Sequence, residues 1–155
     1  MKPKLALLAA AVAGLFAFAP GALAAGPVDA VKSDIAKLQA DLQTAHDILI
    51  ADAKKLTADA QAAKGGNAAA ARATIKADRA KLRADRKSAH EILKADRMQL
   101  RADLKAAREA KVDRAELKPL LQQLRATAKQ LRAEIHAAIV EARQAVRELR
   151  ESLKK

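Results

Sequence analysis

The stretch LTADAQAAKGGNAAAARATIKAD, residues 56–78, places two glycines between two copies of one short motif, [Val/Ile/Leu]-x-[Ala/Ser]-Asp. The motif occurs eight times, in two sets of four with the same spacings of 7, 11 and 7 residues, and the second set is the first moved by 44 residues. A step of 7 and a step of 11 together make about five helical turns, so every copy returns to one helix face. The copies begin at Val31, Leu38, Leu49, Leu56, Ile75, Leu82, Leu93 and Leu100.

The break between the two sets is the segment Lys64-Gly65-Gly66-Asn67. Glycine adopts left-handed backbone at no steric cost, which suits the end of a helix. The motif copies are also symmetric about the point between Gly65 and Gly66, so a chain that reverses there sets Leu38 level with Leu93. The sequence therefore predicts an antiparallel helical hairpin made by internal duplication, with helices over about 28–64 and 68–111.

A third helix is predicted over about 113–153, with a seam of leucine, isoleucine, valine and alanine at steps of three and four. Asp113 and Glu116 have the spacing of a capping box, and Pro119 disfavours helix at Lys118. We expect a bend between 111 and 119; one kinked continuous helix is the alternative. The predicted fold class is all-α, an elongated coiled-coil-like three-helix bundle. Because the seams are thin, partial disorder or self-association is the alternative.

Residues 1–24 have the pattern of a cleaved secretion signal, which leaves residues 25–155 as a single helical domain. Lys2 and Lys4 precede an apolar run, and Ala22-Leu23-Ala24 fits the small-x-small cleavage rule. An uncleaved anchor is the alternative. The chain has no cysteine, which excludes disulfides and lipid attachment at cysteine. A secreted chain without disulfides favours the bacterial periplasm.

Positive charge is concentrated in the second predicted helix. The whole chain has a net charge of +12, and residues 68–112 hold thirteen basic and six acidic groups. On a helical wheel, eleven of these basic residues share one flank, and such a stripe attracts polyanions. The alternative to polyanion binding is that Arg and Lys were selected for helix propensity and that their alkyl stems cover the apolar seam. The predicted anion- or partner-binding residues are Arg72, Lys76, Arg79, Arg83, Arg86, Lys87, Lys94, Arg97, Arg101, Lys105 and Arg108.

The eight motif aspartates fall on the opposite flank and share one face of the predicted hairpin. Asp34 is expected almost level with Asp96, and Asp52 with Asp78. Like charges this close are unfavourable unless positive charge lies among them. Arginines of the third helix or of another basic partner are the simplest source. A divalent cation bound by Asp34, Asp96, Asp52 and Asp78 is a second, since hard cations bind carboxylates. A solvated acidic face is the third.

The sequence favours a protein without catalytic activity and without a cofactor. His46, His90 and His136 lie at similar heights in the predicted bundle, but their wheel positions favour a polar layer or exposed side chains over a zinc site. Cysteine, tyrosine and tryptophan are absent, and no glycine-rich phosphate loop or zinc-protease motif occurs. The predicted loops are short.

These features predict a secreted interaction protein, a scaffold or chaperone-like binder of anionic envelope components or client proteins. No transmembrane segment is expected after signal cleavage. Binding of nucleic acid through its phosphates is the first alternative. The secretion signal and the loss of both phenylalanines, Phe16 and Phe18, with that signal argue against it. Binding of divalent cations by the aspartate face is the second alternative.

Overall fold

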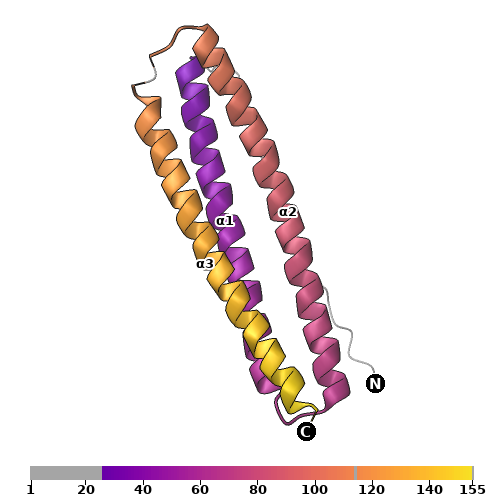
Figure 1. The fold of residues 1–155 in the computed structure, drawn as a ribbon. Helices are drawn as coiled ribbons and strands as arrows, with labels where there is room; N and C mark the ends of the chain where they lie inside the picture. Colours follow the sequence, from indigo (N-terminus) through magenta and orange to yellow (C-terminus); the bar gives the residue numbers. More distant parts are fainter. Residues whose placement is uncertain (1–25, 114, 155) are drawn as a thin grey trace, which may run out of the picture.

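The computed structural model describes residues 26–113 and 115–154, and it contains three α-helices. They are α1 (Pro27–Ala62), α2 (Ala68–Glu109) and α3 (Leu117–Ser152), and Figure 1 shows α1 and α3 running in one direction and α2 in the other. The predicted all-α three-helix bundle is confirmed. The predicted signal, residues 1–24, lies outside the described residues. Within those residues, no helix combines the length and apolarity that a bilayer crossing requires.

The hairpin turn between α1 and α2 forms at the paired glycines. Gly65 has a φ of 79°, the left-handed conformation that glycine adopts without strain. Asn67 then caps α2, because its side-chain oxygen accepts hydrogen bonds from the N–H groups of Ala69 (2.8 Å) and Ala70 (3.1 Å). The turn therefore depends on one glycine for its backbone and on one asparagine for the start of the next helix.

α2 ends in a Schellman motif although the chain has no glycine there. Lys111 has a φ of 55°, and its N–H donates to the carbonyl of Arg108 at 3.1 Å. The N–H of Val112 donates to the carbonyl of Ala107, also at 3.1 Å. These two bonds satisfy carbonyls that a helix end leaves unpaired, and glycine is the usual residue at the left-handed position. A lysine in this conformation carries a steric penalty.

The connection to α3 differs in detail from the predicted capping box. The Asp113 carboxylate accepts from the N–H of Ala115 at 2.9 Å, whereas Glu116 forms an ion pair with Lys32 of α1 at 2.7 Å. α3 consequently begins at Leu117 and Pro119 lies in its first turn. A proline is tolerated in the first turn because the N–H it lacks would have no partner within the helix.

α1 is the central helix of the bundle. It packs along its length against both α2 and α3, which meet each other at very few points. The core has two separate clusters, one at each end. The first contains Val31, Ile35, Leu38, Leu42, Leu100, Ala107, Leu117, Leu124 and Leu131, with Leu93 packed against it. The second contains Ala53, Leu56, Ala60, Ala71, Ile75, Ala142, Ala145, Val146 and Leu149.

Between the two clusters the bundle is open on the side where α2 and α3 approach each other. α2 has no buried residue between Asp78 and Asp96, and α3 has none between Leu131 and Ala142. Because both helices are held by α1 and not by each other, a groove runs between them.

Replacement of Lys111 by glycine should stabilise the fold. Lys111→Gly removes the left-handed penalty, and part of this gain is lost to the greater freedom of glycine in the unfolded chain, so we expect a net gain of about 0.5–1 kcal/mol. Urea unfolding followed by circular dichroism measures it. Lys111→Ala, which removes the same charge but keeps the Cβ, is the control and should give little gain. Equal stabilisation by both variants would contradict the backbone explanation.

Candidate functional site

The motif aspartates lie at the junction of α1 and α2, where lysines from the same repeat bind them. Lys55 contacts Asp59, four residues on in its own helix, and Asp78 across the junction at 2.7 Å. Lys81 pairs in the same way with Asp85 (2.7 Å) and with Asp52. We call each such group, one lysine and two aspartates from two helices, a Lys–Asp clamp.

A third Lys–Asp clamp lies nearer the other end of the hairpin. Lys37 pairs with Asp41 at 3.0 Å and with Asp96 of α2. In each clamp the cross-helix aspartate is buried: Asp52, Asp78 and Asp96 are 7–8% exposed. A buried carboxylate needs a positive partner, and the flexible lysine stem reaches it from the surface.

The clamps correct the expectation that arginines of the third helix neutralise the aspartate face. That face is neutralised by Lys37, Lys55 and Lys81, which belong to the hairpin itself. Wheel positions alone did not reveal the role of these lysines, because a lysine four residues before an aspartate indicates only an ordinary ion pair within one helix. Only the packed hairpin brings the second aspartate to the same ammonium group.

The partners across the junction are also displaced from the predicted levels. Asp103 raises the pKa of Asp34 more than Asp96 does, and Asp52 contributes to the pKa shift of Asp85. Side chains on a helix lean toward its N-terminus, so in an antiparallel pair the carboxyl groups of level residues move apart. Two carboxyl groups therefore meet when each aspartate lies closer to the C-terminus of its helix than the level position does.

The fourth equivalent position lacks a lysine. Gln99 occupies it and donates a hydrogen bond to Asp103 at 3.2 Å. Burial, and then the neighbouring Asp103, raise the pKa of Asp34. In the clamps, by contrast, hydrogen bonds from Lys55 and Lys81 lower the pKa values of Asp59 and Asp85. The fourth position thus shares the layout of the clamps but has a neutral amide in place of the ammonium group.

The candidate metal ligands are not gathered into a cation site. In the described ranges, no group of three or more His, Asp or Glu side chains is placed to hold a metal ion. Asp52, Asp78 and Asp96 each bind a lysine ammonium where a cation would lie. Asp34 lies apart, beside Asp103.

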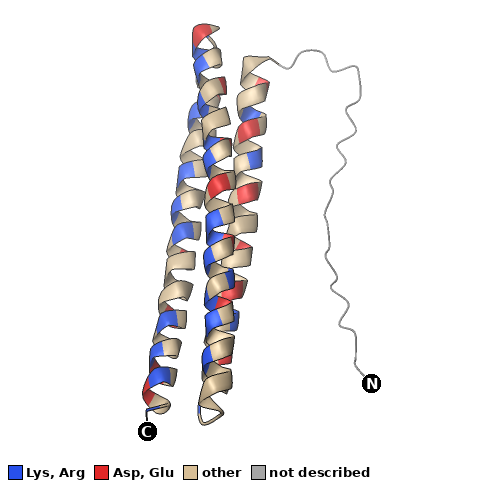
Figure 2. Ribbon diagram, turned by 90° about the vertical axis from the view of Figure 1, so that its right-hand side faces the viewer, with Lys and Arg blue, Asp and Glu red and all other residues tan. Residues whose placement is uncertain are grey.

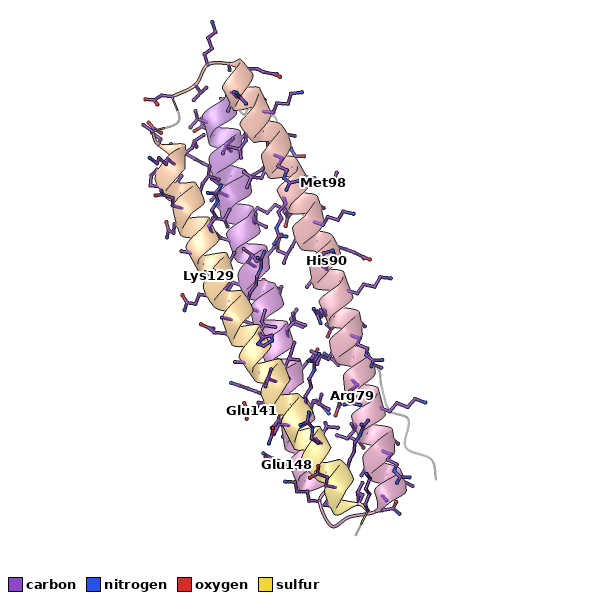
Figure 3. All side chains as sticks on the ribbon, viewed as in Figure 1. Arg79, His90, Met98, Lys129, Glu141 and Glu148 are labelled. Atoms are coloured by element: carbon purple, nitrogen blue, oxygen red, sulfur yellow. The ribbon has the colours of Figure 1, made fainter. Side chains whose placement is uncertain are left out.

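The three histidines do not form a cluster. His46 bridges two helices, since its Nε2 lies 2.8 Å from Glu134 of α3 and its Nδ1 lies 2.8 Å from Asp47. His90, labelled in Figure 3, and His136 are exposed. His46 therefore acts as a polar link between α1 and α3 at mid-length, where the core is thinnest.

Basic side chains line the groove between α2 and α3. The half of this groove near the hairpin turn, which we call the basic groove, has two sections of about 680 and 230 Å³. Half-buried and buried apolar side chains form its floor, including Ile75, Leu82, Ile139, Val146 and Leu149. Its eight basic residues are Arg72, Lys76, Arg79, Arg83 and Arg86 of α2, Arg143 and Arg150 of α3, and Lys154, which follows α3.

Positive charge in the basic groove is unbalanced. No acidic residue lines either section, and no carboxylate within the described part of the chain forms an ion pair with any of the eight basic residues. Burial lowers the pKa of the Arg79 guanidinium, and nearby positive charge lowers it further. That charge comes from Arg150, Arg83 and Arg143.

Acidic residues lie elsewhere on the molecule. Figure 2 shows basic residues along α2 and α3 and most acidic residues of the hairpin where α1 and α2 meet. Glu141 and Glu148, labelled in Figure 3, project from the flank of α3 that faces away from α2, and Glu148 pairs with Lys64 at 2.9 Å. The two flanks of α2 therefore have opposite electrical environments.

The predicted binding residues divide into three groups. Arg72, Lys76, Arg79, Arg83 and Arg86 line the basic groove. Lys105 and Arg108 line a second hollow of about 850 Å³ near the α2–α3 connection, which also contains Asp113. The remaining four, Lys87, Lys94, Arg97 and Arg101, line neither hollow.

Sequence reasoning missed the contribution of α3 to the basic groove. Arg143 and Arg150 lie on one flank of that helix, which the sequence indicates, but the flank was expected to face the aspartates. Helix periodicity shows that such a flank exists and not which neighbour it faces. That choice depends on which side of the hairpin α3 packs against.

Comparisons of the chain with protein-family models, with curated proteins and with solved structures gave no match.

Replacement of Asp34 by asparagine should stabilise the fold at pH 7. The raised pKa means that the native state binds this proton more tightly than the unfolded chain does, whose pKa is near 3.8. The stability contributed by Asp34 is therefore present below about pH 3.8 and is lost as the pH rises through the native pKa. We expect Asp34→Asn to gain about 1 kcal/mol at pH 7 and nothing at pH 3, measured by urea unfolding.

Asp59→Asn is the matched control with the opposite sign. Its lowered pKa stabilises the native state above the unfolded pKa, and this contribution is lost as the pH falls through the native value. The control should therefore be less stable than the natural protein at pH 7. Stabilisation by both variants would show that the two aspartates do not differ as described.

A lysine at position 99 should complete a fourth Lys–Asp clamp. Gln99→Lys places an ammonium group beside Asp103 and Asp34, as in the other three copies, and should raise stability at pH 7 by about 0.5–1 kcal/mol. It should also lower the pKa of Asp34, which carboxyl NMR titration measures directly. Gln99→Met, similar in length and uncharged, is the control. An unchanged Asp34 titration in the lysine variant would refute the equivalence of the four positions.

Proposed function

We propose that this protein is a non-enzymatic binder of anionic macromolecules and that the basic groove is its binding surface. One observation carries the proposal: eight basic residues, seven of them from two helices, converge on an apolar floor with no acid among them. Arginine makes up most of the set, and its planar guanidinium binds carboxylates and phosphates through paired hydrogen bonds. No catalytic step or cofactor is part of the proposal.

The pairing pattern elsewhere in the protein supports a binding role for these residues. Six aspartates of the hairpin are bound by Lys37, Lys55 and Lys81 at the α1–α2 junction. The arginines of the basic groove instead face each other, and repulsion between like charges is unfavourable until an anion relieves it. Residues chosen only for helix propensity or solubility have no reason to converge in this way.

The predicted secretion signal gives the proposal a cellular setting. If residues 1–24 are removed during export, the basic groove meets the anionic polymers and client proteins of the bacterial envelope in the periplasm. The protein would then act there as a scaffold or a chaperone-like binder. Electrostatic attraction along the groove would speed the encounter and make binding weaker as salt rises.

Fluorescently labelled poly-L-glutamate tests the proposal. We expect Arg79→Gln combined with Arg150→Gln to reduce its affinity by about tenfold at low salt, because both guanidinium groups lie in the basic groove. Binding is followed by fluorescence anisotropy over a range of salt concentrations, and circular dichroism checks that each variant is folded.

The matched control removes the same charge from outside the groove. Lys54 of α1 and Lys129 of α3 are exposed and line none of the hollows, so Lys54→Gln with Lys129→Gln should change the affinity by less than about twofold. Figure 3 shows Lys129 on the side of α3 that faces away from α2. Equal losses in the two double variants would indicate attraction by net charge alone and would refute a groove site.

A further inference from the structure

We infer that the basic groove takes an acidic amphipathic α-helix of a partner protein, which packs between α2 and α3 as the fourth helix of the bundle. This inference rests on the proposed function and names the class of partner. The helices already present leave a place for it, since α1 contacts both α2 and α3 while these two helices barely contact each other. A fourth antiparallel helix is a common way to close such an arrangement.

The groove has the dimensions of a helix-binding site. Its α2 wall extends from Arg72 to Arg86, which at 1.5 Å per residue is about 21 Å, or four helical turns. Leu82 and Ile139 are only partly buried and face this space from opposite helices. A docked helix with an apolar stripe would cover both side chains and join the two sections of the floor.

The spacing of the basic residues favours a helix over other anions. Along α2 the wall residues are spaced by 4, 3, 4 and 3 residues, which keeps them in one continuous stripe along the helix. Arg143 and Arg150, seven residues apart, form the matching wall on α3. A partner helix with glutamate or aspartate on both sides of its apolar stripe would meet a basic residue at every turn.

Other occupants fit these features less well. A lipid headgroup concentrates its negative charge at one point, whereas the basic residues extend along the whole groove. An extended peptide would leave its backbone N–H groups unpaired, because the described residues offer no strand edge, whereas a helix satisfies its own. A nucleic-acid duplex has no apolar stripe for the floor.

A second copy of this chain is also a poor occupant, because most carboxylates of the described residues are already engaged. The motif aspartates lie in the Lys–Asp clamps or beside Gln99. On α3, Glu134 is bound to His46 and Glu148 to Lys64. The partner must therefore bring its own acidic residues.

A designed 21-residue peptide tests the inference with the full chain. It carries leucine at the seam positions of three heptads and glutamate on both flanks, with a fluorescent label. A scrambled peptide of the same composition keeps the charge and loses the apolar stripe. We expect the designed peptide to bind at least tenfold more tightly than the scrambled one, and to gain helical circular dichroism on binding. NMR shifts should map to the residues that line the basic groove.

A change in the floor separates this inference from the proposed function. Ile139→Gln should lower the affinity for the designed peptide about tenfold and leave the affinity for poly-L-glutamate unchanged. Val140→Gln, at an exposed neighbour outside the groove, is the control and should leave both affinities unchanged. Equal binding of designed and scrambled peptides, lost together in the Arg79→Gln and Arg150→Gln variant, would refute the helix and retain the anion site. Absence of binding by every acidic probe would refute both. Tighter, Ile139-dependent binding to phosphatidylglycerol vesicles or to a DNA duplex would also overturn the inference.

Discussion

The structure depends on a lysine that holds two aspartates from neighbouring helices. The core seams are rich in alanine and interrupted at mid-length, so apolar packing alone specifies the register of α1 and α2 weakly. The Lys–Asp clamps tie α1 to α2 through Lys37 with Asp96, Lys55 with Asp78 and Lys81 with Asp52, and these contacts add to the weak apolar specification of the register. Buried ion pairs add little net stability, and fixing the register is the role in which buried polar groups are best attested.

The same clamps determine how charge is distributed over the molecule. They hold six aspartates of the hairpin at the α1–α2 junction, together with the lysines that neutralise them. The arginines of α2 are left on the opposite flank, and α3 packs where its own arginines extend that flank. A chain that contains both acidic and basic residues thereby acquires a groove lined by charges of one sign only. The electrostatic design of the binding surface thus follows from the packing of the hairpin.

Repeat spacing predicts much of this architecture because helical periodicity is a local property. The equal spacings of the motif copies place them on one face, and the glycine pair marks the reversal, so the hairpin and the bend before Leu117 could be anticipated. The start of α3 was less predictable, since Glu116 forms an ion pair with Lys32 from a distant helix and does not cap its own. The lysines of the clamps were visible in the sequence, but their second aspartates were not.

The sequence by itself determined three helices, their approximate positions, their apolar faces and a basic flank on the second helix, because each is encoded in residues within a few turns of one another. Only the tertiary structure decided what each flank faces. The lean of side chains toward the helix N-terminus selected the aspartate partners across the junction. The placement of α3 beside the arginines of α2, and not beside the aspartates, then created the groove, because contact between distant helices depends on the packing of all three together.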